Sequence, residues 1–148
     1  MKNFHETHLV FPAFANTAAV TAAANGLTVL TSQGQVATFI TTHTLLATSE
    51  TATFVIQQSA DNTTFTTVND PSTGAAASTT LVAASAAVNM MSIPFSALLE
   101  TSKYIRLSVS AVGGSASFDL AAVCVISGIQ SHPTSTTDLM FSKFVSYV

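Results

Sequence analysis

Hydrophobic and polar residues alternate with a period of two along several short segments of the chain. The clearest runs from Tyr104 to Val112, where every second residue from Ile105 is apolar and Arg106 is on the opposite face. Because successive side chains of a β-strand point to opposite sides of the sheet, this alternation predicts a strand with one buried face. The residues expected on that face are Ile105, Leu107, Val109 and Ala111.

A second alternating segment, Phe118 to Ile126, follows almost at once. The sequence Gly113-Gly114-Ser115 separates the two segments, and a glycine pair between alternating runs is typical of a tight hairpin turn. We therefore expect these two strands to be hydrogen-bonded neighbours. The residues expected on the buried face of the second strand are Phe118, Leu120, Ala122, Cys124 and Ile126.

Another hairpin is predicted in the middle of the chain. Thr51 to Ser59 is rich in β-branched residues, and Thr64 to Val68 follows after the turn Ala60-Asp61-Asn62-Thr63. Aspartate and asparagine suit such a turn, because they tolerate the left-handed backbone conformation and hydrogen-bond to their own backbone.

Weaker patterns bring the total to about seven or eight strands. Residues Thr17 to Asn25 could form a helical turn or a strand, and their Thr and Val content favours the strand. Asp70 to Ala87 has the low-complexity composition of a long loop. The remaining predicted strands are Leu27 to Leu30 and Val36 to Thr42, with a turn at Ser32 to Gln35 between them, and Val88 to Phe95.

Short alternating strands separated by turn residues predict an all-β fold, a single antiparallel β-sandwich of jelly-roll type. We expect the sandwich to span residues 17–128, with an N-terminal arm at 1–16 and a C-terminal arm at 129–148. The arms carry apolar residues that need cover, either from their own sandwich or from a neighbouring subunit. The candidate partner-binding residues are Leu9, Phe11, Phe14, Met140, Phe141, Phe144 and Tyr147.

Composition supports a folded protein that associates. Only 7% of the 148 residues are charged, whereas about 25% is usual, yet 48% are hydrophobic and the net charge is −3. Disordered chains combine low hydrophobicity with high net charge, so this chain should fold. With so few charges, little keeps copies apart, and self-association or a permanent partner is expected.

Several classes of function are disfavoured by the sequence. The four basic residues, Lys2, Lys103, Arg106 and Lys143, form no stripe, so nucleic-acid binding is not expected. No apolar run is long enough for a signal peptide or a membrane span, which predicts a protein made in a cytoplasm. Cys124 has no cysteine partner and lies in an apolar run, as a buried, inert thiol does.

The sequence contains no recognisable catalytic or metal-binding constellation. His5 and His8 are three apart, but their segment is not helical in pattern. His43 and His132 have no carboxylate partner at a fixed local spacing, and each lies next to turn-like sequence, where a solvated imidazole is expected. The seven acidic residues are spread singly. There is neither a phosphate-binding glycine loop nor a nucleophile elbow. We predict no enzyme activity, no catalytic residue, no metal and no cofactor.

Three segments carry a resemblance. They are Gln57 to Phe65, Lys103 to Leu107 and Phe118 to Val123. Together they are similar to small β-sandwich virion proteins of tailed bacteriophages. In those proteins a strand leads into a Ser-x-Asp-x-x-x-aromatic turn, and a later "Tyr-Ile-Arg" strand forms a hairpin with the last core strand. Residues 51–127 follow that layout, although Phe65 stands where a tryptophan is frequent.

The resemblance implies a structural protein of the virion. The first function that the resemblance implies is that of a capsid decoration or cement protein, which binds the assembled major capsid protein lattice as a homo-oligomer such as a trimer. A head–tail junction or tail accessory protein is the alternative within that class. A carbohydrate-binding adhesion module is the rival from another class, although the chain has no Trp and only two Tyr residues to stack on sugar rings.

Overall fold

The computed structural model describes residues 8–70, 72–83 and 87–129. Within these ranges the chain forms β-strands and two 3-10 helices, and no α-helix. The strands are β1 (His8–Val20), β2 (Ala24–Asn25), β3 (Val29–Leu30), β4 (Val36–His43), β5 (Thr51–Ser59), β6 (Thr66–Thr67), β7 (Ser78–Val82), β8 (Val88–Pro94), β9 (Tyr104–Gly113) and β10 (Phe118–Ser127), and the helices are η1 (Thr31–Gln33) and η2 (Phe95–Ala97).

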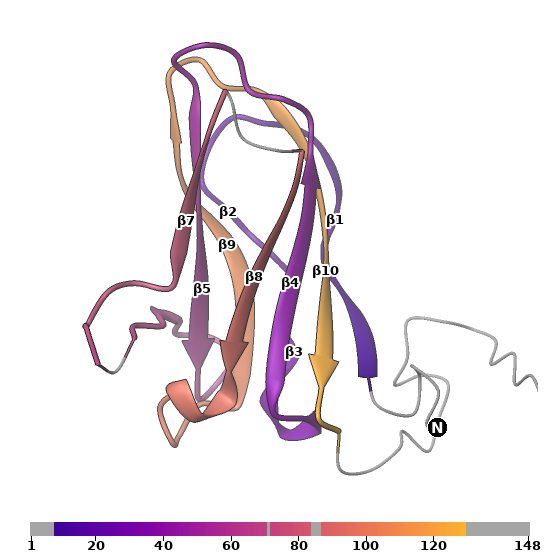
Figure 1. Cartoon of the computed structure of the whole chain (residues 1–148), viewed down its shortest axis with the longest axis vertical. Coiled ribbons are helices and arrows are strands. Elements are labelled where there is room, and N and C mark those ends of the chain that lie inside the picture. Colours follow the sequence, from indigo (N-terminus) through magenta and orange to yellow (C-terminus); the bar gives the residue numbers. More distant parts are fainter. Residues whose placement is uncertain (1–7, 71, 84–86, 130–148) are drawn as a thin grey trace, which may run out of the picture.

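The strands form two antiparallel sheets. Sheet A has the order β1-β10-β4-β8, and sheet B has the order β2-β9-β5-β6. In sheet B, β2 and β3 pair with successive parts of β9. In the same way, β6 and β7 pair with successive parts of β5. In Figure 1, β5, β7 and β9 of sheet B lie on the left, and β1, β4 and β10 of sheet A lie on the right.

The connections are those of a jelly roll. Because β2 and β3 share one side of β9, and β6 and β7 share one side of β5, each pair occupies a single strand position. The chain then visits eight positions, and the two sheets read 1-8-3-6 and 2-7-4-5. That order is the double Greek key of a jelly-roll sandwich, so the predicted all-β fold class is confirmed.

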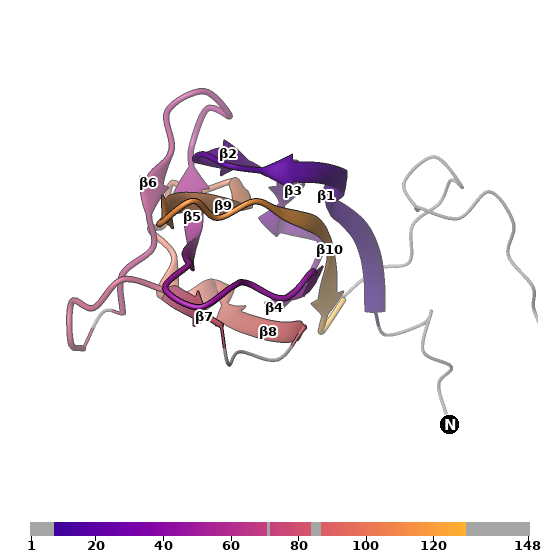
Figure 2. The ribbon, with the colours of Figure 1, turned by 90° about the horizontal axis from the view of Figure 1, so that it is seen from above.

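The core lies between the sheets, and both sheets supply large side chains to it. Phe39, Phe118 and Leu120 of sheet A and Phe54 and Leu107 of sheet B are at most 1% exposed. The rings of Phe54 and Phe118 meet edge to face, with centroids 6.4 Å apart. Figure 2 shows the strands arranged around the interior in which these side chains meet.

The two clearest predicted strands are present, with the expected residues buried. On β9, Ile105, Leu107 and Val109 are fully buried. On β10 the five residues from Phe118 to Ile126 that were expected inside are all buried.

The predicted hairpin between these two strands is wrong. β9 pairs with β5, β2 and β3, whereas β10 pairs with β1 and β4. The segment after Gly113 crosses from sheet B to sheet A, with Gly114 in the left-handed region at φ 72°. The two buried faces therefore meet across the core and are not side by side in one sheet.

The middle hairpin is confirmed. β5 pairs with β6 through Gln57–Thr67 and Gln58–Thr66, and Asn62 takes the left-handed conformation at φ 62°. The region Asp70 to Ala87 is not all loop, because β7 lies within it and pairs with β5. Leu81 of β7 is 2% exposed, so this strand carries part of the core.

The N-terminal arm expected at residues 1–16 needs correction. Residues 8–20 form β1, which pairs with β10 along its length, so the sandwich begins at or before His8 and not at residue 17. Leu9 and Phe14 are buried and Phe11 packs against the core, which places these three candidates inside their own sandwich. Met140, Phe141, Phe144 and Tyr147 lie outside the described residues.

Candidate assembly surface

The outer face of sheet A is formed by the side chains that alternate with the buried ones. In β10 four residues alternate with the core positions, and three of them, Ala121, Val123 and Val125, are apolar, whereas the fourth, Asp119, lies near the beginning of the strand. This strand therefore has two apolar faces, one in the core and one directed outward. The side chains of the outer face are His8, Val10, Pro12, Val36, Thr38, Ile40, Thr42, Val88, Met90, Ser92, Pro94, Asp119, Ala121, Val123, Val125 and Ser127.

One apolar row crosses all four strands of this face. Pro12 pairs with Val123, Val123 with Ile40, and Ile40 with Met90. Residues paired in this way have Cβ atoms about 5 Å apart, so the row is continuous. Met90, at the end of the row, is 70% exposed.

The centre of the outer face of sheet A carries no formal charge, and the charged Asp119 lies at one end of it, where its carboxylate accepts the backbone N–H of Ala19. Its polar members are hydroxyl residues, and Thr38 and Ser92 hydrogen-bond to each other at 2.9 Å between their side-chain oxygens. A shallow hollow of about 310 Å³ lies beside the row, lined by Pro12, Phe14, Ile40, Ala121 and Val123 among others. The centre of such a face can be covered by another protein without burying an unpaired charge.

The outer face of sheet B has a different character. Thr53 of β5 and Thr80 of β7 lie opposite each other there and hydrogen-bond through their hydroxyls at 3.0 Å. Gln57 of β5 accepts a hydrogen bond of 2.8 Å from Nε of Arg106 on β9. This face is polar and is charged at Arg106, so the two outer faces of the sandwich differ in chemistry.

The Ser-x-Asp-x-x-x-aromatic turn has a structural role. Ser59 Oγ donates to Asp61 Oδ1 and accepts the backbone N–H of Asn62, at 2.9 and 3.0 Å. Asp61 Oδ1 also accepts the backbone N–H groups of Thr64 and Thr63, both at 2.9 Å. These bonds, led by the one from Thr64, hold the pKa of Asp61 well below its usual range.

The aromatic residue of this motif is placed against the basic residue of the "Tyr-Ile-Arg" strand. The guanidinium carbon of Arg106 lies 3.8 Å from the centroid of the Phe65 ring. The contact is a cation–π interaction that fastens the turn to sheet B. Two of the three segments of the resemblance, Gln57 to Phe65 and Lys103 to Leu107, therefore meet in sheet B, whereas Phe118 to Val123 lies in sheet A and does not form the hairpin that the resemblance implies.

His43 is buried, although a solvated imidazole was expected. It lies at the end of β4 and is 7% exposed. Its Nδ1 donates to the carbonyl oxygen of Thr44 at 2.7 Å, and Nε2 accepts from the side-chain amide of Asn89 at 3.1 Å. Both ring nitrogens therefore take part in hydrogen bonds within the fold, so His43 is a structural residue.

The acidic residues of the described ranges serve turns and strand ends. Asp70 accepts from the side chain and backbone of Ser72, which lowers its pKa, and Asp119 accepts the backbone N–H of Ala19 at 3.1 Å. Glu50 accepts the backbone N–H of Ala47 at 2.6 Å. No group of three or more His, Cys, Asp or Glu side chains in the described ranges could hold a metal ion.

Cys124 is fully buried in β10, facing the core. Burial raises the pKa of its thiol to about 12, so the thiolate that a nucleophile or metal ligand requires does not form at neutral pH. Neither of the short helices in the described part of the chain is long and apolar enough to cross a membrane.

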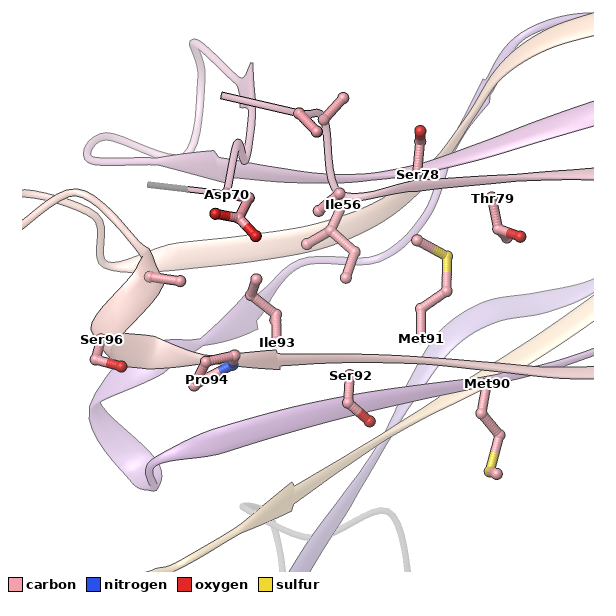
Figure 3. Close-up of a pocket in the computed structure, with 14 residues that line it drawn as sticks. Ile56, Asp70, Ser78, Thr79, Met90, Met91, Ser92, Ile93, Pro94 and Ser96 are labelled. Atoms are coloured by element: carbon pink, nitrogen blue, oxygen red, sulfur yellow. The ribbon is translucent and has the colours of Figure 1, made fainter. Parts of the chain in front are cut away.

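A groove of about 670 Å³ opens between β7 and β8, where the edges of the two sheets meet. Met91 and Ile93 of β8 point into it toward Ile56, whereas Met90 and Ser92 point to the other side of the strand (Figure 3). The groove therefore lies directly beside the free edge of β8 and is apolar at its base.

The sequence analysis singled out the arms and missed the outer face of sheet A. The signal was present in β10, where the run Ala121 to Ile126 is apolar at every position. Alternation predicts which face of a strand is buried, and it does not distinguish a polar opposite face from one that is also apolar.

Comparisons with known proteins found a similar solved structure, but no matching protein family and no matching curated protein. Among solved structures the chain is similar to the SPBc2 prophage-derived protein YomS, with 12% sequence identity and a TM-score of 0.49, over 80% of this chain and 92% of that chain.

Proposed function

We propose that this protein is a non-enzymatic structural protein of a phage virion, and that it decorates and stabilises the assembled capsid. The observation that carries the proposal is the largely apolar outer face of sheet A, which has no charge at its centre, set against the polar outer face of sheet B. A protein with one such face can lie flat on a protein lattice and present hydroxyl groups to solvent.

The fold and the composition support this proposal. Jelly rolls are recurrent in viral capsid proteins, although they also occur in lectins, so the fold raises the expectation without deciding it. A low content of charge suits a protein packed in many copies, because neighbouring copies repel one another little. The turn and strand motifs that are similar to those of phage virion proteins add to the same case.

The proposed mechanism is stabilisation by mass action. A protein that binds the assembled lattice, and not its separated subunits, shifts the assembly equilibrium toward the lattice. The major capsid protein would be its partner, and the virion its location. Many weak contacts, repeated by the symmetry of the shell, are sufficient for this role.

The test is the copy number and position of the chain in purified particles, by quantitative mass spectrometry and an averaged electron-microscopy map. A decoration protein is expected in hundreds of copies on the shell, whereas a junction or tail protein occurs in roughly a dozen copies at one vertex. Absence of the chain from purified particles would exclude the virion role.

A carbohydrate-binding module is the rival proposal. Of the two tyrosines, Tyr104 lies half-buried on β9 in the described part of the chain. A glycan array probed with the purified chain tests this rival, since an adhesin retains glycan when it is free of the particle.

A further inference from the structure

The four sheet edges of the sandwich differ in how they are protected from pairing. β1 has three register shifts against β10 and contains Pro12. At one edge of sheet B, next to β9, the edge strand is divided into the two-residue strands β2 and β3. At the other edge, next to β5, it is divided into β6 and β7. Bulges, prolines and short strands are the usual devices that prevent edge-to-edge association.

The β8 edge has no such device before its last residue. β8 pairs with β4 without a register shift from Thr42–Val88 to Val36–Pro94. It contains no charged residue and no glycine, and only its final residue is a proline. In the described part of the chain, β4 is its only strand neighbour. A regular, uncharged and partly apolar edge of this kind favours the addition of another strand.

The direction of the backbone groups of β8 follows from two hydrogen bonds at its ends. The N–H of His43 donates to the carbonyl of Ala87 at 3.0 Å, and the N–H of Phe95 donates to the carbonyl of Gln35 at 2.7 Å. In an antiparallel ladder, residues that bond to the neighbour alternate with residues that face away. The odd-numbered residues of β8 therefore bond to β4, and Val88, Met90 and Ser92 turn their N–H and C=O groups outward.

We propose that two copies of this chain pair through β8 in an antiparallel, two-fold arrangement centred on Met90. In an antiparallel pair the outward groups of one copy must meet outward groups of the other. A two-fold axis at Met90 satisfies this rule, because it sets Met90 opposite its own copy and Val88 opposite Ser92. Pro94 has no N–H to donate, and it ends the ladder at the next outward position.

A second copy fits this edge better than a charged partner. The residues along the edge carry no charge, so two copies meet without repulsion. Met90 is 70% and Val88 56% exposed, and both side chains become partly covered in the pair. β8, with seven residues, is longer than β7, the next longest edge strand that pairs without a register shift, and pairing of β8 about a two-fold axis closes at two copies, in place of the trimer suggested by resemblance.

The pair also extends the outer face of sheet A. The row Pro12, Val123, Ile40 and Met90 continues into the same row of the second copy, since the two sheets A become one. The interface at one edge strand is smaller than the roughly 1,200 Å² of a stable complex, so association in solution should be weak and concentration-dependent. The inference concerns the purified chain and does not rest on the virion proposal.

Cysteine cross-linking of the full chain tests the register. Residues opposite each other in a hydrogen-bonded antiparallel pair have Cα atoms about 5.5 Å apart, which a disulfide tolerates. Met90→Cys should therefore form a covalent dimer under mild oxidation on the order of tenfold faster than Val88→Cys, whose opposite residue is Ser92. The double variant Val88→Cys with Ser92→Cys should cross-link as Met90→Cys does, because its two cysteines are about 13 Å apart within one strand and meet only between copies.

The controls distinguish cross-linking in this register from nonspecific association. Leu99→Cys places a thiol at a residue that is 61% exposed but lies outside β8, where its backbone N–H donates to Gln58 of β5, and it should cross-link no faster than Val88→Cys. The native Cys124 is buried and does not compete. Circular dichroism and thermal melts establish that each variant is folded.

Charge exchange gives an independent readout by sedimentation velocity. Met90→Lys should abolish the concentration-dependent dimer, because the two lysines would lie opposite each other across the two-fold axis. An equal mixture of Met90→Lys and Met90→Glu should restore it, because a lysine of one copy then lies opposite a glutamate of the other. Leu99→Lys should leave the dimer unchanged. Equal cross-linking at positions 88, 90 and 99 would overturn the proposal. Cross-linking that requires removal of residues 130–148 would also overturn it, since β8 would then be covered by the chain's own end.

Discussion

At the scale of the residue, the turn at Asp61 shows how a chain with few charges uses them. Asp61 is fully solvent-accessible, yet its carboxylate accepts hydrogen bonds from Ser59, Thr63 and Thr64. A carboxyl group whose pKa is lower in the folded state than in the unfolded state stabilises the fold above the unfolded pKa. That contribution disappears as the pH falls through the folded pKa.

We predict that Asp61→Asn lowers the free energy of unfolding at pH 6, and that its difference from the native chain shrinks progressively below about pH 4. Urea unfolding of both proteins at pH 6 and at pH 3 measures this. Glu100→Gln removes a charge at an exposed residue and serves as the control. Equal stability of the Asp61→Asn variant and the native chain at pH 6 would contradict the prediction.

Phe118 gives the largest effect expected of a single side chain. It is 1% exposed and meets the rings of Phe54 and His43 edge to face, at 6.4 Å in both cases. Phe118→Ala should lower the free energy of unfolding by about 3–5 kcal/mol, because it removes buried surface and leaves a cavity. Leu99→Ala, at an exposed position, should change it by less than about 0.5 kcal/mol. Chemical denaturation monitors both variants.

At the scale of the element, the passage of the chain from β2 to β3 depends on Gly26. Its N–H donates to Leu107 O at 2.9 Å, and the next N–H, of Leu27, donates to Ala13 O at 2.7 Å. The segment is therefore held by β9 in one sheet and by β1 in the other. A Cβ atom at Gly26 would lie 2.6 Å from Leu107 O and still closer to Ala13 O.

Gly26→Ala should accordingly force the two sheets apart locally and destabilise the fold by about 1–3 kcal/mol, as overpacking does. Ala22→Ser, an exposed change just before β2, is the matched control and should have little effect. Thermal melts of both variants give the comparison. A melting temperature for Gly26→Ala equal to that of the control would show that the passage can relax.

The alternation of residues predicted which face of a strand is buried, but not which strand lies beside it. Ile105 on β9 and Leu120 on β10 were both expected inside and are both fully buried, yet they belong to different sheets. A glycine pair allows a tight turn and equally a crossover between sheets, so the hairpin could not be distinguished from the jelly-roll connection. The position of β1 was missed for a related reason, because its three register shifts disturb the period of two.

At the scale of the whole molecule, the sandwich is polar on one side and apolar on the other. Sheet A and sheet B bury similar side chains between them, so the asymmetry does not serve the core of a single chain. Covering the outer face of sheet A is favourable at about 25 cal/mol for each Å² of apolar surface removed from water, and that gain is available only through association. The same asymmetry could not be predicted from composition, because it depends on the register of four strands.

Ile40 is the residue at which this asymmetry is best tested. It lies in the apolar row between Val123 and Met90, with a neighbouring strand on each side. Ile40→Lys points its long side chain to solvent and should leave the sandwich folded, but docking would then bury an unpaired ammonium group. Binding of the purified variant to particles that lack the chain should fall by at least about tenfold, as expected when a central contact is lost. Thr53→Lys introduces the same charge on the outer face of sheet B and should bind normally. If Thr53→Lys lost binding and Ile40→Lys kept it, sheet B would be the docking face, and the proposed orientation on the capsid would be reversed.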